Sequence, residues 1–262
     1  WDKTVRIWNA TSGEEQHVLK GHSDRVNSVA IQGDTIASGS YDNTVCIWNA
    51  SSGEEQHVLK GHSGGVNSVA IQGDTIVSGS TDNTMRIWNA TSGKEQHVLK
   101  GHSGGISSVA KEGDTIVSGS SDKTVRIWYA ALGEEQHVLE GHSGFVQNVA
   151  IFGDTIVSQS LNVTLSQSLY ETRYWNAQTG EALDADDADE AEASTTMLLY
   201  VPGKRTWVNV ENGTHVKLSG GIGFTTDHAI DEATSRQGSL YVVGDDSGMV
   251  HILHAQGIEP ET

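Results

Sequence analysis

Cysteine and proline are nearly absent from this chain, which has one cysteine, Cys46, and two prolines among 262 residues. A single cysteine excludes a framework of internal disulfides, and we expect a reducing, cytoplasmic location. No apolar run approaches the ~20 residues of a membrane-spanning helix, so the sequence predicts no membrane segment. Sparse proline together with 30 glycines favours many short strands joined by tight turns.

Positive charge is also scarce, because 16 Lys and Arg residues stand against 34 Asp and Glu residues, which gives a net charge of −18. Nucleic acids and acidic membrane surfaces bind clustered basic side chains, and no such cluster occurs in the sequence. We therefore expect neither class of partner. The densest acidic run, residues 181–194, is predicted to be a solvated loop, with a site for a basic partner or a cation as the alternative.

The chain does have a period of 40 residues between tryptophans. The recurring tryptophans are Trp8, Trp48, Trp88 and Trp128, and Trp175 follows after a longer interval. Residues 21–60, 61–100 and 101–140 repeat almost the same sequence, and each repeat opens on Gly-His. Self-similarity at this period, with an early Gly-His and a late Trp, indicates the blades of a β-propeller. Because a repeat array grows by stacking units, we expect a single domain over residues 1–262.

These repeats resemble the WD-repeat (tryptophan-aspartate repeat) family. The aspartate of the name-giving dipeptide is missing, since Asn49, Asn89 and Tyr129 follow the tryptophans. The resemblance implies an all-β propeller built from four-stranded antiparallel blades. Residues 1–157 also resemble the repeat arrays of fungal NACHT-type receptor proteins, in which the array acts as a recognition module.

Each regular unit is predicted to form four short strands, rich in β-branched residues that suit a position between neighbouring blades. In the first regular unit these strands cover residues 26–32, 34–40, 44–50 and 54–60. The turn after each third strand closes on a glycine, and the glycines are Gly13, Gly53, Gly93, Gly133, Gly180, Gly213 and Gly257. Counting these turns predicts a seven-bladed design.

The first blade is predicted to be incomplete, because residues 1–20 hold only a third and a fourth strand. The predicted units are a half blade at 1–20, regular repeats at 21–60, 61–100 and 101–140, a stretched repeat at 141–183, and two degenerate blades at 184–262. In the degenerate part, strands are predicted at 197–201, 206–210, 215–218, 224–230, 240–243 and 249–253. Our hypothesis is a ring cut about one repeat short at its front, whose sign is an open seam between the first and last blades.

A set of His, Ser, Asp and Trp recurs once in each regular unit, and the family resemblance implies that it is a buried hydrogen-bonded tetrad. The members are His22, Ser38, Asp42 and Trp48, then His62, Ser78, Asp82 and Trp88, then His102, Ser118, Asp122 and Trp128. The alternative is a hydrolase triad, but a catalytic centre is built once and this set occurs three times. We therefore expect no catalytic residue.

The fifth unit keeps His142, Ser158 and Trp175 of this tetrad, and it offers Asn162 or Tyr170 where Asp is expected. The histidines that belong to the repeats lie on separate blades, so they do not converge on one ion. We expect neither a cofactor nor a metal.

Candidate partner-binding residues come from positions that face the top of the propeller in the family. They are the residues three and five after the Gly-His histidine and the residue before the tetrad Asp. Carried over, they are Trp1, Arg25, Asn27, Tyr41, Asn67, Thr81, Ser107, Ser121, Phe145 and Gln147, with Gly65 and Gly105 at two equivalent positions. Arg and aromatic side chains most often anchor interfaces, so Arg25, Tyr41, Trp1 and Phe145 lead this group. The alternative is neutral drift at exposed positions.

The leading functional hypothesis is a non-enzymatic WD-repeat scaffold or recognition module that binds a protein or peptide partner on the top face. One alternative is a propeller enzyme with a site in the central channel, which predicts unrepeated acid, base or metal-binding residues there. The other is a decayed fragment without a partner. The sequence shows no unrepeated catalytic set within the repeats.

Overall fold

The computed structural model describes residues 2–9, 12–163, 168–184, 230–233, 240–245 and 250–254. Every regular element in these ranges is a β-strand. The described ranges accordingly hold no helix of the length and apolarity needed to cross a membrane. The all-β fold class predicted from the repeats is confirmed.

Four sheets have four antiparallel strands each, in simple sequence order. The first three contain β3 (Val26–Gln32), β4 (Thr35–Ser40), β5 (Thr44–Asn49) and β6 (Glu55–Lys60); β7 (Val66–Gln72), β8 (Thr75–Ser80), β9 (Thr84–Asn89) and β10 (Glu95–Lys100); and β11 (Ile106–Glu112), β12 (Thr115–Ser120), β13 (Val125–Tyr129) and β14 (Glu134–Leu139). The fourth contains β15 (Phe145–Phe152), β16 (Thr155–Val163), β17 (Ser168–Asn176) and β18 (Ala182–Leu183). The strands predicted for the first regular unit are confirmed to within one residue.

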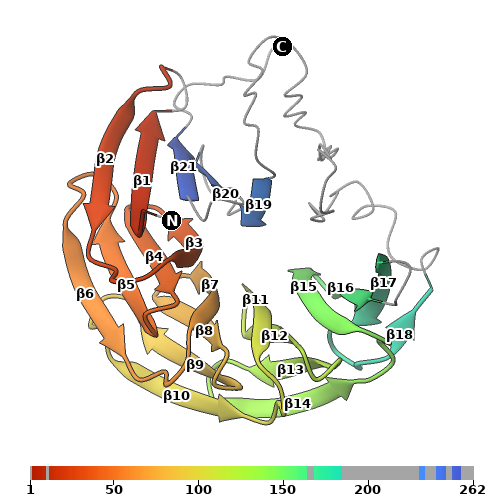
Figure 1. Ribbon diagram of the computed structural model, residues 1–262. Helices are drawn as coiled ribbons and strands as arrows, with labels where there is room; N and C mark the ends of the chain where they lie inside the picture. Colours follow the sequence, from red (N-terminus) through yellow and green to blue (C-terminus); the bar gives the residue numbers. More distant parts are fainter. Residues whose placement is uncertain are drawn as a thin grey trace, which may run out of the picture.

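The sheets stand side by side as the blades of a propeller (Figure 1). The first strands β3, β7, β11 and β15 line the inside of the arc, and the fourth strands β6, β10, β14 and β18 lie along its outer rim. Each blade packs its first strand against the first two strands of the blade before it, so neighbours cover each other's faces.

Buried side chains fill the spaces between blades. Trp48, Trp88 and Trp128 are each no more than 2% exposed. One core cluster joins Val45, Ile47 and Leu59 of one blade to Val66 and Val69 of the next. β-branched residues are stiff and pack well on a pleated surface, which explains their dominance on strands that are covered on both faces.

A fifth sheet joins strands from opposite ends of the chain, in the order β19-β20-β21-β1-β2. Its strands are β19 (Ile230–Ala233), β20 (Leu240–Asp245), β21 (Val250–His254), β1 (Thr4–Asn9) and β2 (Glu15–Lys20). β21 pairs with β1 in parallel, from Val5↔Val250 to Asn9↔His254. The first and last strands of the described chain therefore belong to one sheet. The pairing satisfies backbone groups along β1 that an open edge would leave unpaired.

The strands predicted at 240–243 and 249–253 are confirmed by β20 and β21. Of the strand predicted at 224–230, only Ile230 is described, and it is the first residue of β19. The predicted strands at 197–201, 206–210 and 215–218, and the turns at Gly213 and Gly257, lie outside the described residues.

The stretched fifth unit lengthens two strands of the fourth four-stranded blade. β16 and β17 have nine residues each, whereas β4 and β5 have six each. The extra residues continue the antiparallel ladder through Leu161↔Tyr170 to Val163↔Ser168. This blade therefore carries a two-stranded ribbon where the regular blades make a short turn.

Candidate interaction site

Each blade has two ends, and its connections decide which side chains share an end. The turn between the second and third strands and the link from the preceding blade meet at one end, as the bond from the N–H of Tyr41 to the carbonyl of Arg25 shows (2.9 Å). We call this end the top face, and it comprises residues 21–25, 41–43 and their equivalents. The bottom face carries the other two turns, for example at Gly33 and Gly53.

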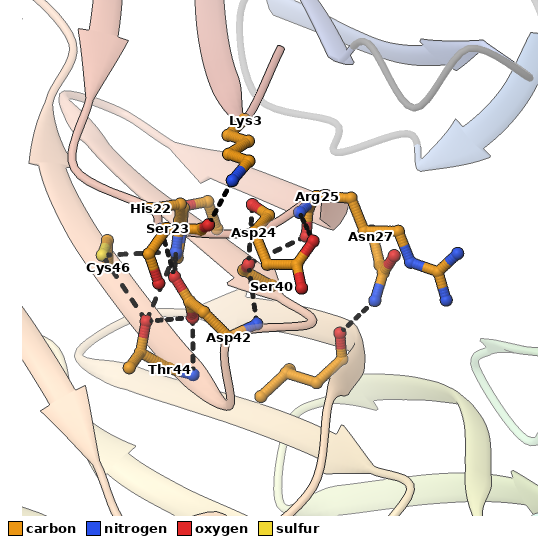
Figure 2. Close-up of polar contacts among 12 residues, drawn as sticks. Lys3, His22, Ser23, Asp24, Arg25, Asn27, Ser40, Asp42, Thr44 and Cys46 are labelled. Carbon is orange, nitrogen blue, oxygen red and sulfur yellow. Dashed lines mark hydrogen bonds and ion pairs between the residues drawn. The ribbon is translucent and has the colours of Figure 1, made fainter. Parts of the chain in front are cut away.

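The first tetrad is one continuous hydrogen-bonded chain beneath the top face. The indole N–H of Trp48 donates to Ser38 Oγ (2.8 Å), and Ser38 Oγ lies 2.8 Å from Nε2 of His22. Nδ1 of His22 lies 2.9 Å from Oδ2 of Asp42. Since Ser38 accepts the indole proton, its own hydroxyl donates to His22, which in turn donates from Nδ1 to Asp42. Figure 2 shows Asp42 between His22 and Thr44.

The second and third tetrads repeat this geometry with the same four residue types. Burial alone would raise the pKa of Asp82, but hydrogen bonds from Thr84, Ser63 and His62 outweigh burial and lower it to about 2. Burial lowers the pKa of His62 below its ordinary value, against the opposing effect of Asp82. The second and third tetrads therefore each pair an ionised carboxylate with a neutral imidazole at neutral pH.

In each tetrad the Ser, His and Asp are hydrogen-bonded in the same order as in a hydrolase triad. The serine, however, is not accessible to a substrate. Ser38, Ser78 and Ser118 are all 0% exposed. The hydroxyl oxygen of each also accepts a tryptophan N–H at 2.8 to 2.9 Å. Burial and this second hydrogen bond favour a structural role for the tetrads.

In the fifth unit, Glu171 stands where the missing tetrad Asp was sought, and neither Asn162 nor Tyr170 does. Its Oε2 accepts hydrogen bonds from the backbone N–H (3.1 Å) and hydroxyl (2.9 Å) of Ser143, as Asp42 accepts from the N–H of Ser23. Glu171 lies four residues before Trp175, the place that Thr124 has before Trp128. Its longer side chain reaches the site from the strand instead of the turn. Counting back six residues from Trp175, the spacing of the tetrad Asp in the regular units, gives Leu169, so this spacing does not point to Glu171.

Glu171 only partly replaces the aspartate. Its Oε2 is 3.9 Å from Nδ1 of His142, and that nitrogen is buried without a hydrogen-bond partner among the described residues. Burial lowers the pKa of His142 to about 4. Ser158 still joins His142 (2.7 Å) to the indole of Trp175 (2.7 Å). Glu171 itself is held by Arg173, whose Nη2 lies 2.6 Å from its Oε1.

Two of the predicted contact residues form a preorganised pair on the top face. The guanidinium carbon of Arg25 lies 4.2 Å from the ring centroid of Tyr41, within cation–π range. Tyr41 is 45% exposed. Its ring covers Gly65 of the next blade so closely that a Cβ there would lie 2.6 Å from Cδ2 of Tyr41. Tyr41 therefore bridges two blades, and only glycine at position 65 leaves it room.

The side chains of three other predicted contact residues donate hydrogen bonds to backbone carbonyls of the next blade. Nδ2 of Asn27 donates to the carbonyl of Val66 (2.8 Å; Figure 2). Nδ2 of Asn67 donates to Ile106 (2.8 Å), and the hydroxyl of Ser107 donates to Val146. The backbone N–H of Val69 returns a bond to Ser28 Oγ (3.1 Å). Side-chain hydrogen bonds thus connect the first strands of adjacent blades. The sequence did not reveal this structural role of Asn27, Asn67 and Ser107.

The remaining predicted contact residues are spread over separate blades. Phe145 is 53% exposed and pairs with Leu161 at the base of the ribbon. Thr81 is exposed on its turn, and Ser121 and Gln147 are half-buried. Trp1 lies outside the described residues. Lys3 joins this face through its ammonium group, which donates to the carbonyl of Ser23 (2.6 Å; Figure 2).

No group of three metal-ligating side chains occurs within the described part of the chain. The tetrad histidines use Nε2 on serine, and His17, His57 and His137 place Nε2 at 3.0 to 3.1 Å from carbonyl oxygens of the next blade. Tyr41 and Phe145 are exposed aromatic side chains on the top face, and Arg25 beside Tyr41 is half-buried.

Comparison with known proteins agrees with this architecture. The sequence model of the family described as "WD domain, G-beta repeat" matches residues 13–49, 53–89 and 93–129. Among solved structures, the chain is similar to the computationally designed Ika4 protein, with a TM-score of 0.54 and 25% sequence identity over 60% of this chain and 94% of that one. No curated protein matches the chain.

Proposed function

The chain is a WD-repeat protein over residues 13–129, and from that premise we propose that it is a non-enzymatic interaction module that receives a protein or peptide partner on the top face. Modules of this family generally mediate protein–protein contacts. The use of the top face, and of particular residues on it, is our proposal for this chain. A cytoplasmic location belongs to the same proposal, and its support is the single buried thiol of Cys46.

The Arg25–Tyr41 pair is the observation that carries the proposal. Tyr and Arg are enriched among the residues that dominate binding energy, and a rigid aromatic ring loses little conformational entropy on binding. The turn that carries Tyr41 is fixed from below, since the hydroxyl of Ser40 donates to the carbonyl of Arg25 (2.8 Å) and accepts from the N–H of Asp42 (3.1 Å). The pair is thus held in place before any partner arrives.

The pair also distinguishes one blade from copies that are otherwise almost identical. At the positions of Arg25 and Tyr41, the next two blades have Gly65 and Thr81, then Gly105 and Ser121. The next two blades have only small residues at these positions. The large side chains there are Arg25, which is half-buried, and the exposed Tyr41 and Phe145. A partner that contacts large side chains therefore has a defined orientation on the face.

Affinity capture from an extract, quantified by mass spectrometry, tests the proposal with two triple variants. The test variant replaces Arg25, Tyr41 and Phe145 by alanine. The matched control replaces Val58, Val138 and Leu132 by alanine; these are exposed at 40%, 39% and 58% and lie on outer strands or a bottom turn. We expect the same partners to be recovered with the unaltered chain and the control. With the test variant we expect at least tenfold less recovery, since the loss of three anchor side chains costs about 1.4 kcal/mol or more.

Equal recovery of all partners by the test variant and the control would overturn the use of the top face. Loss with the control alone would move the interface to the outer rim. Circular dichroism of both variants confirms that the blades are intact, because each substitution shortens an exposed or half-exposed side chain and leaves the tetrads unaltered.

A further inference from the structure

A lysine and a phenylalanine are exposed on the top face, two blades away from the Arg25–Tyr41 pair. Lys123 lies in the turn between β12 and β13, and Phe145 is the first residue of β15 on the next blade. Lys123 is exposed, and Phe145 is 53% exposed. We call these two residues the Lys123–Phe145 patch.

The repeat geometry places Phe145 beside the turn that carries Lys123. A Cβ on Gly105 would lie 3.3 Å from Cα of Thr81, in the same turn of the preceding blade. Phe145 and Ser121 hold the equivalent positions one blade further on. The hydrogen bond from a backbone N–H of β15 to a serine of β11 (3.2 Å) also repeats the one from β11 to β7 (3.1 Å). The side chain of Phe145 therefore starts next to residues 121–123.

The ammonium group of Lys123 forms no hydrogen bond or ion pair with the residues that the structure describes. The neighbouring carboxylate of Asp122 is occupied, since it lies 2.8 Å from Nδ1 of His102 and accepts from the N–H (3.0 Å) and hydroxyl (2.7 Å) of Thr124. The Asp122 side chain is 7% exposed. The positive charge of Lys123 is thus the accessible charge of this turn.

The backbone at Lys123 lies in the left-handed region, with a φ of +72°. The equivalent residues of the two preceding blades are Asn43 and Asn83, with φ of +72° and +68°. Asparagine adopts this conformation several times more often than lysine does, so lysine is the less favourable residue here. Lys3 has the same position and a φ of +63°, and its ammonium group binds the carbonyl of Ser23. Because strained residues gather at functional sites, the strain at Lys123 favours a use for its side chain.

We propose that the Lys123–Phe145 patch binds a partner segment in which a carboxylate side chain stands beside an apolar one, the carboxylate at Lys123 and the apolar side chain on Phe145. The proposal rests on the proposed use of the top face and names the chemistry of the partner at one place on it. Charge complementarity supports it, because the other carboxylate that reaches these two turns, Glu171, is paired with Arg173. An exposed aromatic ring supplies contact area at a low cost in conformational entropy.

Phage-displayed random dodecapeptides, selected on the immobilised full chain, test the proposal. We expect the selected peptides to be enriched in Asp or Glu next to an apolar residue. A parallel selection on a Lys123→Asn variant should lose the enrichment in Asp and Glu and keep the apolar residue. Asparagine is the matched substitution, since the two preceding blades have it in the same turn.

Titration of the best peptide measures the contact at Lys123 directly. We expect Lys123→Asn to weaken binding about two- to fivefold, the range of an exposed ion pair. Replacing the carboxylate of the peptide by an amide should weaken binding to the unaltered chain by the same factor and leave binding to Lys123→Asn unchanged. The control variant Asn83→Lys, which adds a lysine to the preceding blade, should leave the affinity unchanged.

Thermal denaturation separates the strain at this turn from the binding role of its side chain. Lys123→Asn relieves the left-handed backbone and should raise the midpoint, whereas Asn83→Lys should lower it. A purely structural lysine would change the midpoint and leave peptide affinity as it is, which would overturn the proposal.

Selected peptides without enrichment in Asp and Glu, or no selected peptide at all, would also overturn the proposal. If peptides without this enrichment still lose binding with the triple alanine variant of the top face, the proposed function stands and only the chemistry assigned to Lys123 is wrong. Peptides that bind the unaltered chain and the triple variant equally would contradict both.

Discussion

Replacing Asp82 by alanine removes the centre of one tetrad, and its effect on stability can be worked out from four contacts. The carboxylate of Asp82 meets Nδ1 of His62 (2.9 Å) and accepts from the backbone N–H of Ser63 (2.9 Å). It also accepts from the N–H (2.9 Å) and the hydroxyl (2.7 Å) of Thr84. Its side chain is 7% exposed and that of His62 is 1% exposed, so water does not readily replace the lost acceptor.

We expect Asp82→Ala to lower the free energy of unfolding by about 1 to 3 kcal/mol, the cost of leaving the buried N–H of the neutral His62 ring without its acceptor. Urea denaturation followed by tryptophan fluorescence measures it, because Trp88 is part of the same tetrad. Asp114→Ala is the matched control, with the same change of charge at an exposed bottom turn and an expected effect within about 0.5 kcal/mol.

The pH dependence supplies a second signature of the same carboxylate. Its pKa in the fold is lowered to about 2 from 3.8. The stabilisation from Asp82 is therefore fully present above pH 3.8 and is lost as the pH falls through 2, a change of about 2 kcal/mol. The reasoning is refuted if Asp82→Ala and Asp114→Ala are equally stable at pH 7, or if Asp82→Ala keeps the full acid-induced loss of the unaltered chain.

Two further predictions concern the fourth blade and the top face. Because the pKa of His142 is lowered from 6.5 to about 4, its unfolded form binds a proton first, and stability falls by about 3 kcal/mol between pH 6.5 and pH 4. His142→Gln should flatten that part of a denaturation series against pH, and an unchanged slope would contradict the assignment to His142. Gly65→Ala should displace the Tyr41 ring and cost about 1 to 3 kcal/mol, since its Cβ would lie 2.6 Å from Cδ2 of Tyr41. Gly105→Ala, whose Cβ would come no nearer than 3.3 Å to Thr81, is its control, and thermal denaturation showing equal losses would contradict the close contact.

The blades could be predicted from sequence because the signals that define them are local and repeated. The tryptophan period, the Gly-His dipeptides and the turn glycines each lie within one unit, and β3 to β6 begin and end within one residue of prediction. The pairing of β21 with β1 was not predicted, since it joins strands about 245 residues apart in the sequence and no signal within one repeat unit points to it.

The candidate site was predictable in part. The sequence located Arg25 and Tyr41 as unrepeated residues, but their mutual contact and the close cover of Gly65 depend on how two blades meet. Asn27 and Asn67 have equivalent positions in two units, and their donors turn toward the next blade, which a single unit cannot show. Glu171 was not predicted because it lies on the strand, whereas the tetrad Asp lies in the turn. Its longer side chain reaches the same backbone N–H from there.

Hydrogen exchange of the chain with and without a captured partner tests the central claim most directly. The use of the top face predicts that partner binding protects amides of residues 24–26, 40–42 and 144–146, around Arg25, Tyr41 and Phe145, while the bottom turns at Gly33, Gly73 and Gly113 exchange at unchanged rates. Protection of the bottom turns with no change around Arg25, Tyr41 and Phe145 would contradict it.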